Sequence, residues 1–147
     1  MLKINKKVEY ALIVLKHMTS SDANPLTQAR EICDLYNTPF DTTAKVMQQM
    51  NQSGFFDSHK GAKGGYNLKV DLNNISYYRL VEIIEGKKSA MDCVENNCNL
   101  INSCNIVSPI TKLNKHLTYF FQGLSLEELL NQKSNDPVDK ILEVTNT

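Results

Sequence analysis

Three glycines and two lysines connect two strand-like runs in the first half of the chain. The runs are Phe55–Ser58 and Tyr66–Val70. Short runs around a glycine-rich connection predict a β-hairpin with a positively charged tip. Glycine allows a tight turn, and lysines without neighbouring acids suit a phosphate backbone or a minor groove. Taken alone, the same residues also fit an ordinary turn with solvated lysines.

Three helical patterns precede this hairpin. Apolar residues recur at three- and four-residue spacing across 6–18, which predicts an amphipathic helix. A second helix is expected after Thr27, which would cap it. Its inward face would be Ala29, Ile32, Cys33 and Tyr36. A turn at 37–39 then leads to a third helix over 40–52, because Pro39 disfavours helical angles in the residue before it. The inward face of this helix would be Thr43, Val46, Met47 and Met50.

The outer face of the third helix carries little charge and many hydrogen-bonding groups. It consists of Asp41, Thr42, Lys45, Gln48, Gln49 and Gln52. Side-chain amides and a lysine can pair with base edges in the major groove, where each base pair has a distinct pattern. A solvated polar face is the alternative for one such helix. Two short helices around a turn, followed by a basic hairpin, favour a winged helix-turn-helix that binds DNA.

The second half of the chain predicts a helix capped by Ser76 and closed by Gly86, then an aperiodic polar stretch over 87–104. A longer helix follows, with Ser108 as cap, Pro109 in its first turn and Gly123 past its end. Its apolar seam is Ile110, Leu113, Leu117, Phe120 and Phe121. A seam of this size predicts a partner helix from a second subunit. Ser125 and Glu128 then form a capping box for a short helix at 126–130.

Three of the four cysteines lie within twelve positions: Cys93, Cys98 and Cys104. In a reducing compartment such a cluster binds metal more often than it forms disulfides. Three thiolates suit an iron–sulphur cluster or zinc. The wide spacing favours a cluster, and paired Cys-x-x-Cys knuckles are absent. Cys33 is isolated at a helical core position, where packing is the simpler interpretation.

The N-terminal sequence, the net charge and the positions of the histidines exclude several classes of function. Lys6, Lys7 and Glu9 interrupt the N-terminus before any apolar core of a secretion signal develops, and no apolar run could span a bilayer. We therefore expect a cytoplasmic protein without a membrane partner. The net charge of zero does not exclude a local basic patch. The three histidines are scattered and no nucleophile–base pair is evident, so an enzyme is not supported. A metal or cluster carrier with a vestigial helix-turn-helix is the competing class.

The order of these elements resembles the Rrf2 family of bacterial winged helix-turn-helix transcription regulators, over about residues 2–130. The most specific segments are 9–12, 58–66, 81–86, the cysteine triplet and 124–129. The resemblance implies a mainly α fold with a two-stranded wing and a long C-terminal dimerisation helix. It also implies a homodimeric repressor of a palindromic double-stranded operator. A 4Fe–4S or 2Fe–2S cluster would respond to nitric oxide, redox or iron–sulphur status. A zinc-binding or cluster-free cysteine regulator is the alternative.

The chain departs from the family at several positions. Lys60 stands where arginine is usual, and Thr42-Thr43 replaces an aromatic–leucine pair. The iron–sulphur cluster regulators have a histidine ligand where this chain has Val107. The nitric-oxide-sensitive repressors are thought to use an aspartate from the partner subunit, and Glu9 occupies the matching place. The resemblance thus implies Glu9 as fourth ligand, although a surface pair with Lys6 or Lys16 is the alternative.

These observations and the resemblance divide the chain into four segments. Residues 1–86 form the DNA-binding domain, 87–104 the cluster-binding loop, 105–131 the dimerisation helix with the short last helix, and 132–147 a flexible tail. The metal ligands would be Cys93, Cys98, Cys104 and Glu9. The residues expected to contact DNA are Asp41, Thr42, Lys45, Gln48, Gln49, Ser58, His59, Lys60, Lys63, Gly65 and Tyr66.

Overall fold

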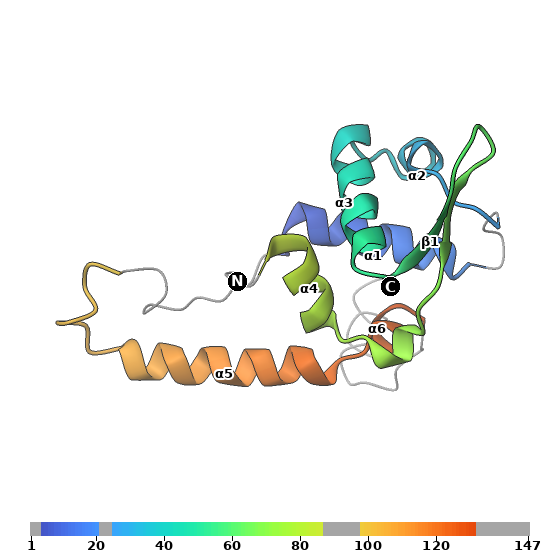
Figure 1. Ribbon diagram of the computed structural model, residues 1–147. Coiled ribbons are helices and arrows are strands. Elements are labelled where there is room, and N and C mark those ends of the chain that lie inside the picture. Colours follow the sequence, from blue (N-terminus) through green and yellow to red (C-terminus); the bar gives the residue numbers. More distant parts are fainter. Residues whose placement is uncertain (1–3, 21–24, 87–97, 132–147) are drawn as a thin grey trace, which may run out of the picture.

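The computed structural model describes residues 4–20, 25–86 and 98–131. Figure 1 shows a compact group of helices with a hairpin at one side and one long helix projecting from it. The elements are α1 (Lys6–Met18), α2 (Ala29–Tyr36), α3 (Phe40–Gln52), β1 (Phe56–His59), β2 (Gly65–Leu68), the 3-10 turn η1 (Leu72–Asn74), α4 (Tyr77–Glu85), α5 (Val107–Gly123) and α6 (Leu126–Leu130). None of the helices in these described ranges is long and apolar enough to cross a membrane.

The core lies where α1, α3 and α4 pack on one another, with α2 against α3. The four inward residues predicted for α3 are all buried, which confirms the helical period there. They meet apolar side chains from the other elements, among them Val14, Leu15, Ile32, Leu80 and Leu126. Because these side chains are fully enclosed within one chain, the helix-turn-helix is a stable framework for the polar face of α3.

The predicted inward face of α2 is only partly confirmed. Ile32 is buried, Ala29 and Cys33 are half-buried, and Tyr36 remains 45% exposed. The Tyr36 hydroxyl lies 3.0 Å from Nδ1 of His17, while Nε2 of His17 lies 3.2 Å from Oε1 of Glu31. A buried histidine on α1 therefore holds α2 through polar contacts, a role that apolar periodicity does not reveal.

The hairpin is held against the start of α2. Its strands are antiparallel, with Phe56 opposite Leu68 and His59 opposite Gly65. Thr27 and Tyr66 exchange two backbone hydrogen bonds of 2.8 and 2.9 Å. The expected capping role of Thr27 was wrong: Gln28 precedes the helix as N-cap and makes no side-chain cap bond. Pairing with β2 fixes Thr27 in extended backbone, and this long-range contact overrides its local capping preference.

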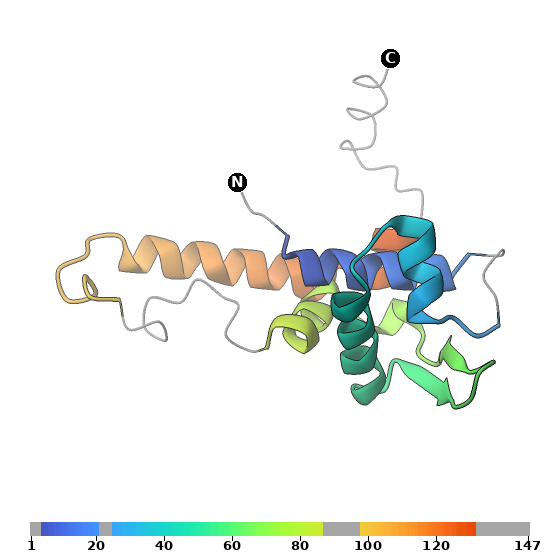
Figure 2. The ribbon, with the colours of Figure 1, turned by 90° about the horizontal axis from the view of Figure 1, so that it is seen from above.

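The long helix α5 projects from the compact group, as both Figure 1 and Figure 2 show. It has no buried residue. The expected cap at Ser108 was wrong, because the helix already begins at Val107 and Ile106 precedes it as N-cap. At its other end the chain returns to the core. Tyr77 N–H donates to Leu124 O at 2.8 Å, and Leu126 N–H donates to Ile75 O at 2.8 Å.

The short helix α6 completes the compact group. Ser125 caps it as predicted, since its hydroxyl accepts a hydrogen bond from Glu128 N–H at 3.1 Å. Leu126 is fully buried. Lys16 on α1 donates hydrogen bonds to Leu130 O at 2.7 Å and to Asn131 Oδ1 at 3.0 Å. The helix α6 is thus part of the same core as α1 and α4.

Candidate nucleic-acid interface and cysteine loop

The outer face of α3 is solvent-accessible along its length. Asp41, Lys45 and Gln48 are exposed, while Thr42 and Gln49 are half-buried. These predicted residues, Asp41 excepted, line one cleft together with Val46, Gln52 and Lys7. Lys7 comes from the start of α1 and was missed by the sequence analysis, because its approach to α3 depends on how the two helices cross. The cleft therefore presents two ammonium groups and several amides on one surface.

The wing presents its lysines at its tip. Ser58, His59, Lys60 and Lys63 are all exposed. Nε2 of His59 lies 2.9 Å from Oδ1 of Asn67 on the opposite strand, so the imidazole is oriented across the hairpin. The two lysines form no ion pair within the described part of the chain. Their charge is therefore free for an external anion.

Gly65 and Tyr66 pack against other residues of the fold. The Tyr66 ring packs on Phe56, with centroids 5.5 Å apart. Gly65 has a φ of +150°, and a Cβ there would come within 2.8 Å of the Thr27 carbonyl oxygen. Beside them, the Gln28 side chain donates a hydrogen bond to Gly64 O at 2.7 Å. These contacts orient the wing relative to α2, so both residues position the lysine-bearing tip whether or not they touch DNA.

Two cysteines of the triplet lie in the loop that leads into α5. Cys98 and Cys104 are half-buried free thiols, and Cys93 lies outside the described residues. The loop is folded by turns, with Ile101 N–H donating to Cys98 O at 3.1 Å. Cys104 lines a cleft with the first three turns of α5, including Lys112 and Lys115. Figures 1 and 2 place this loop at the end of α5 that lies away from the compact group.

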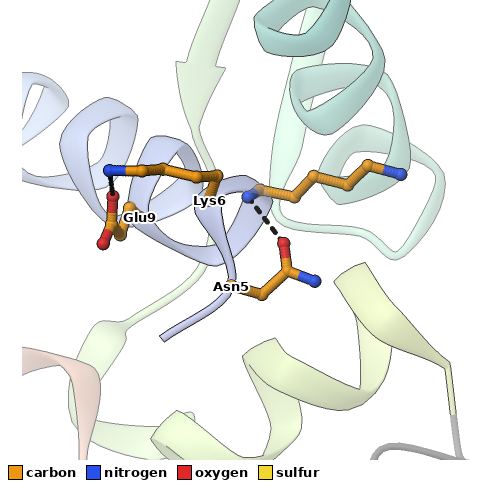
Figure 3. A network of polar contacts seen from close by, with 4 residues as sticks. Asn5, Lys6 and Glu9 are labelled. Carbon is orange, nitrogen blue, oxygen red and sulfur yellow. Dashed lines mark hydrogen bonds and ion pairs between the residues drawn. The ribbon is translucent and has the colours of Figure 1, made fainter. Parts of the chain in front are cut away.

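Glu9 lies on α1 and forms an ion pair with Lys6, three residues earlier in the same helix (Figure 3). Its Oε2 accepts a hydrogen bond from Lys6 Nζ at 2.7 Å, and both side chains are solvent-accessible. This hydrogen bond, reinforced by the charge of the carboxylate, raises the pKa of Lys6. Among the described residues of one chain, no three His, Cys, Asp or Glu side chains gather as a metal site. Glu9, Cys98 and Cys104 therefore do not form such a group within these described residues.

Cys33 has a packing environment. It is half-buried on α2, and its sulphur accepts a hydrogen bond from Thr38 Oγ1 at 3.6 Å. The Thr38 hydroxyl in turn accepts one from Thr43 Oγ1 at 2.8 Å. This chain of contacts joins α2 to α3 across the turn.

Sequence and structure comparisons decide the family. The Rrf2 family model, described as an iron-dependent transcriptional regulator, matches residues 4–132. This chain belongs to the Rrf2 family. The transcriptional regulator NsrR of Bacillus subtilis is 25% identical over 116 residues, which cover 79% of this chain and 76% of that protein.

Solved structures show the same fold. CymR, the global cysteine regulator of B. subtilis, matches with a TM-score of 0.68 and 18% identity, over 91% of this chain and 100% of that one. IscR of T. potens matches with a TM-score of 0.61 and 18% identity, over 94% and 96%. The winged helix-turn-helix prediction is thereby confirmed.

Family membership also establishes the general activity. Rrf2 proteins are DNA-binding transcription regulators, so the expectation of a regulator rather than an enzyme is confirmed. The relatives named above are three different regulators, NsrR, CymR and IscR, and the two solved structures have the same fold as this chain. The signal sensed by this chain must therefore be argued from its own residues.

Proposed function

We propose that this protein is a homodimeric repressor in which an iron–sulphur cluster, held by Cys93, Cys98 and Cys104, sets the affinity for a palindromic operator. In this proposal residues 1–86 bind DNA, 87–104 hold the cluster and 105–131 form the dimer contact. The observation that carries it is the location of two free thiols at the start of an exposed helix joined to a helix-turn-helix.

The exposed side chains of α5 support the homodimer. Leu113 is 47% exposed, Phe120 62% and Tyr119 81%. Phe121 packs on Tyr77 of the same chain, with ring centroids 5.1 Å apart, so only part of the seam is used internally. An apolar helix face without a partner favours association with a second copy, because burial removes that surface from water. Crossed α5 helices would then place two reading heads side by side, where a reading head is the helix-turn-helix of one subunit together with its wing.

The reading head suits duplex DNA. In helix-turn-helix proteins the second helix enters the major groove, and dimers bind half-sites about one helical turn apart. Here α3 would read base edges with Thr42, Lys45, Gln48 and Gln49, and the wing lysines would contact the minor groove or its phosphates. Two equivalent heads related by a two-fold axis require a palindromic operator.

The chemistry of the loop fits a cluster. Thiolates are the usual ligands of iron–sulphur clusters. Cys98 and Cys104 are available, since neither is in a disulfide, and Lys112 and Lys115 beside Cys104 can offset negative charge. When bound, the cluster would supply iron that reacts with nitric oxide or oxidants. The residues of the chain would hold it, orient it and join it to α5.

Glu9 is the proposed fourth ligand, contributed to the cluster of the partner subunit. Figure 1 draws residues 98–106 at the end of α5 that lies away from the compact group with α1, which favours a ligand from a second chain. A carboxylate is a hard ligand that binds such iron weakly, and an incoming small molecule could displace it. Glu9 would first have to leave Lys6, whose ion pair is exposed and therefore weak.

Anaerobic purification tests the cofactor. The protein should be brown, and each of the three cysteine-to-serine changes should remove most of the visible absorbance that arises from sulphur-to-iron charge transfer. Cys33→Ser is the matched control and should keep the colour. A colourless protein with one zinc per chain would replace the cluster by the zinc alternative.

Gel-shift titration with and without the cluster separates a regulator from a carrier. A duplex selected from a random library by the purified protein should bind one form at least tenfold more tightly. Equal affinity of both forms would refute cluster-controlled binding.

The role of Glu9 is tested by comparing the Glu9→Ala variant with a Lys6→Ala control. Only the first change should make the cluster labile or weaken its control of operator affinity. Lys6→Ala removes the same ion pair but leaves the carboxylate, so it should retain control. Identical spectra, affinity and nitric-oxide response in Glu9→Ala and wild-type protein would exclude the ligand role.

A further inference from the structure

The two arginines of the chain have different surroundings. Arg30 lies in the first turn of α2, and its guanidinium carbon is 4.5 Å from the centre of the Phe40 ring. Phe40 is the first residue of α3. The contact thus spans the turn of the helix-turn-helix. Arg79, on α4, instead lies 3.5 Å from Glu82 in an i,i+3 ion pair.

Both members of the Arg30–Phe40 pair are on the surface. Arg30 is exposed, and Phe40 is 42% exposed although it is a large apolar residue. Arg30 makes no ion pair with any described residue. A positive charge without an internal counter-ion, held against an exposed ring, is available to an external anion.

A guanidinium held over a ring suits one kind of anion. A guanidinium is planar and has five N–H donors that point outward in its plane. The ring beneath the guanidinium carbon restricts the side chain before a partner arrives, and the donors that point away from the ring stay available. Such a pre-oriented group binds the paired oxygens of a phosphate better than a mobile ammonium group does.

The place of the pair in the fold identifies the source of the phosphate. The first helix of a helix-turn-helix crosses the DNA backbone while the second lies in the major groove. Arg30 is on the first of these helices, and its platform is at the start of the second. We propose that Arg30, positioned by Phe40, binds a backbone phosphodiester of the operator at the edge of the major groove read by α3. This proposal rests on the DNA-binding mode described under Proposed function.

The salt dependence of binding tests the contact. Arg30→Ala should weaken binding to the selected duplex and make the plot of log K against log [salt] less steep. Two lost contacts per dimer correspond to about 1.8 units of slope, at about 0.9 per phosphate. The affinity ratio of wild type to variant should therefore shrink about 12-fold when salt rises from about 50 to about 200 mM. Ethylation interference should lose one protected phosphate in each half-site.

The matched control is Arg79→Ala, which removes the same charge from a site already paired with a carboxylate. Its salt slope should equal that of the wild type. Phe40→Leu separates the platform from the charge: affinity should fall a few-fold while the slope stays unchanged. Thermal unfolding of each variant, measured without DNA, establishes that the fold is retained.

Several outcomes would overturn the proposal. If Arg30→Ala lowers the unfolding temperature but keeps the wild-type salt slope and ethylation pattern, the pair only joins α2 to α3. If Arg79→Ala flattens the slope equally, the effect is one of overall charge. Wild-type protein that bound no duplex DNA would refute the binding mode and this contact together. Wild-type binding with an unchanged Arg30→Ala slope would refute the contact alone.

Discussion

The four inward side chains of α3 are completely enclosed, whereas α5, a longer amphipathic helix, has no buried residue. Thr43, Val46, Met47 and Met50 are each 0% exposed, in contact with side chains from the same chain. On α5, Tyr119 is 81% exposed and Phe120 62%. The two helices have similar apolar patterns, so the pattern alone does not reveal where the partner surface lies. For α3 it lies within the chain, and for α5 we propose that it comes from a second copy of the chain.

The difference assigns separate physical roles to the two ends of the protein. The reading end is complete in one subunit, which keeps the polar face of α3 and the wing in a fixed relation. In the proposed dimer the α5 end is incomplete in one subunit, so it would respond to association and to events in the cysteine loop. Changes at α3 should therefore act on folding or base contacts, and changes at α5 on assembly.

Introducing charge on α5 should have the largest effect. Leu113→Asp combined with Phe120→Asp should give a folded monomer, because both side chains are exposed in one chain and would be buried only in the dimer. Operator affinity should fall by about 100- to 10,000-fold, since two linked heads bind far more tightly than one. Sedimentation velocity and gel shift measure the two quantities. Gln122→Asp, at an exposed polar position, is the control, and a double variant that remained dimeric would contradict the assigned role of α5.

A core change in α3 should come next. Met47→Ala removes a fully buried side chain and should lower the free energy of unfolding by about 2–5 kcal/mol. Gln48→Ala, at the adjacent exposed position, should change it by less than about 0.5 kcal/mol. Urea unfolding at one fixed protomer concentration measures both. Equal values would show that the interior of α3 is not tightly packed.

A charge change in the wing should be smaller and confined to DNA binding. Lys63→Ala should leave the dimer and the free energy of unfolding unchanged, because the side chain is exposed and forms no described ion pair. If its ammonium contacts phosphate, the salt slope should flatten by about 1.8 units for two wings. Lys69→Ala, which removes a lysine paired with Asp57, is the control. An unchanged slope would show that the wing points away from DNA.

The smallest effect concerns the junction that joins α5 to the core. Ser125→Ala removes the cap of α6 and should cost about 0.5–2 kcal/mol of stability. Thr111→Ala also removes a hydroxyl, on exposed α5, where it donates a hydrogen bond to Val107 O of the preceding turn. That change should be nearly neutral in urea unfolding. If Thr111→Ala lowered the free energy of unfolding more than Ser125→Ala does, α5 would unfold together with the core of its own chain, which contradicts the expectation.

The sequence predicted the elements that depend on local periodicity. The bounds and inward face of α3 were correct because a 3.6-residue apolar period and a proline turn define them locally. The polar outer face of α3 followed from the same period, and the exposed lysines of the wing followed from the glycine-rich connection between two strand-like runs. The cap at Thr27 was wrong because a long-range backbone pairing holds that residue.

Other parts of the site depend on tertiary packing and were not predictable. Lys7 joins the cleft beside α3 only because α1 crosses it, and Arg30 meets Phe40 across a turn. The cysteine loop has no period, so its residue types could suggest a ligand set without placing it. Cys93 lies outside the described residues, and the complete triplet remains a prediction.

The paired backbone hydrogen bonds around Ser76 and Ser125 have a mechanical consequence. They attach the end of α5 to the start of α4, which packs against α1 and α3. A helix of 17 residues is about 25 Å long at about 1.5 Å per residue. Moving as a rigid body, this helix would rotate about its attachment to the core. Moving the cysteine end sideways by about 1 Å turns a rigid arm of this length by about 2°. In a dimer the two arms would turn together, so a small displacement at the thiols becomes a change in the angle between the two reading heads.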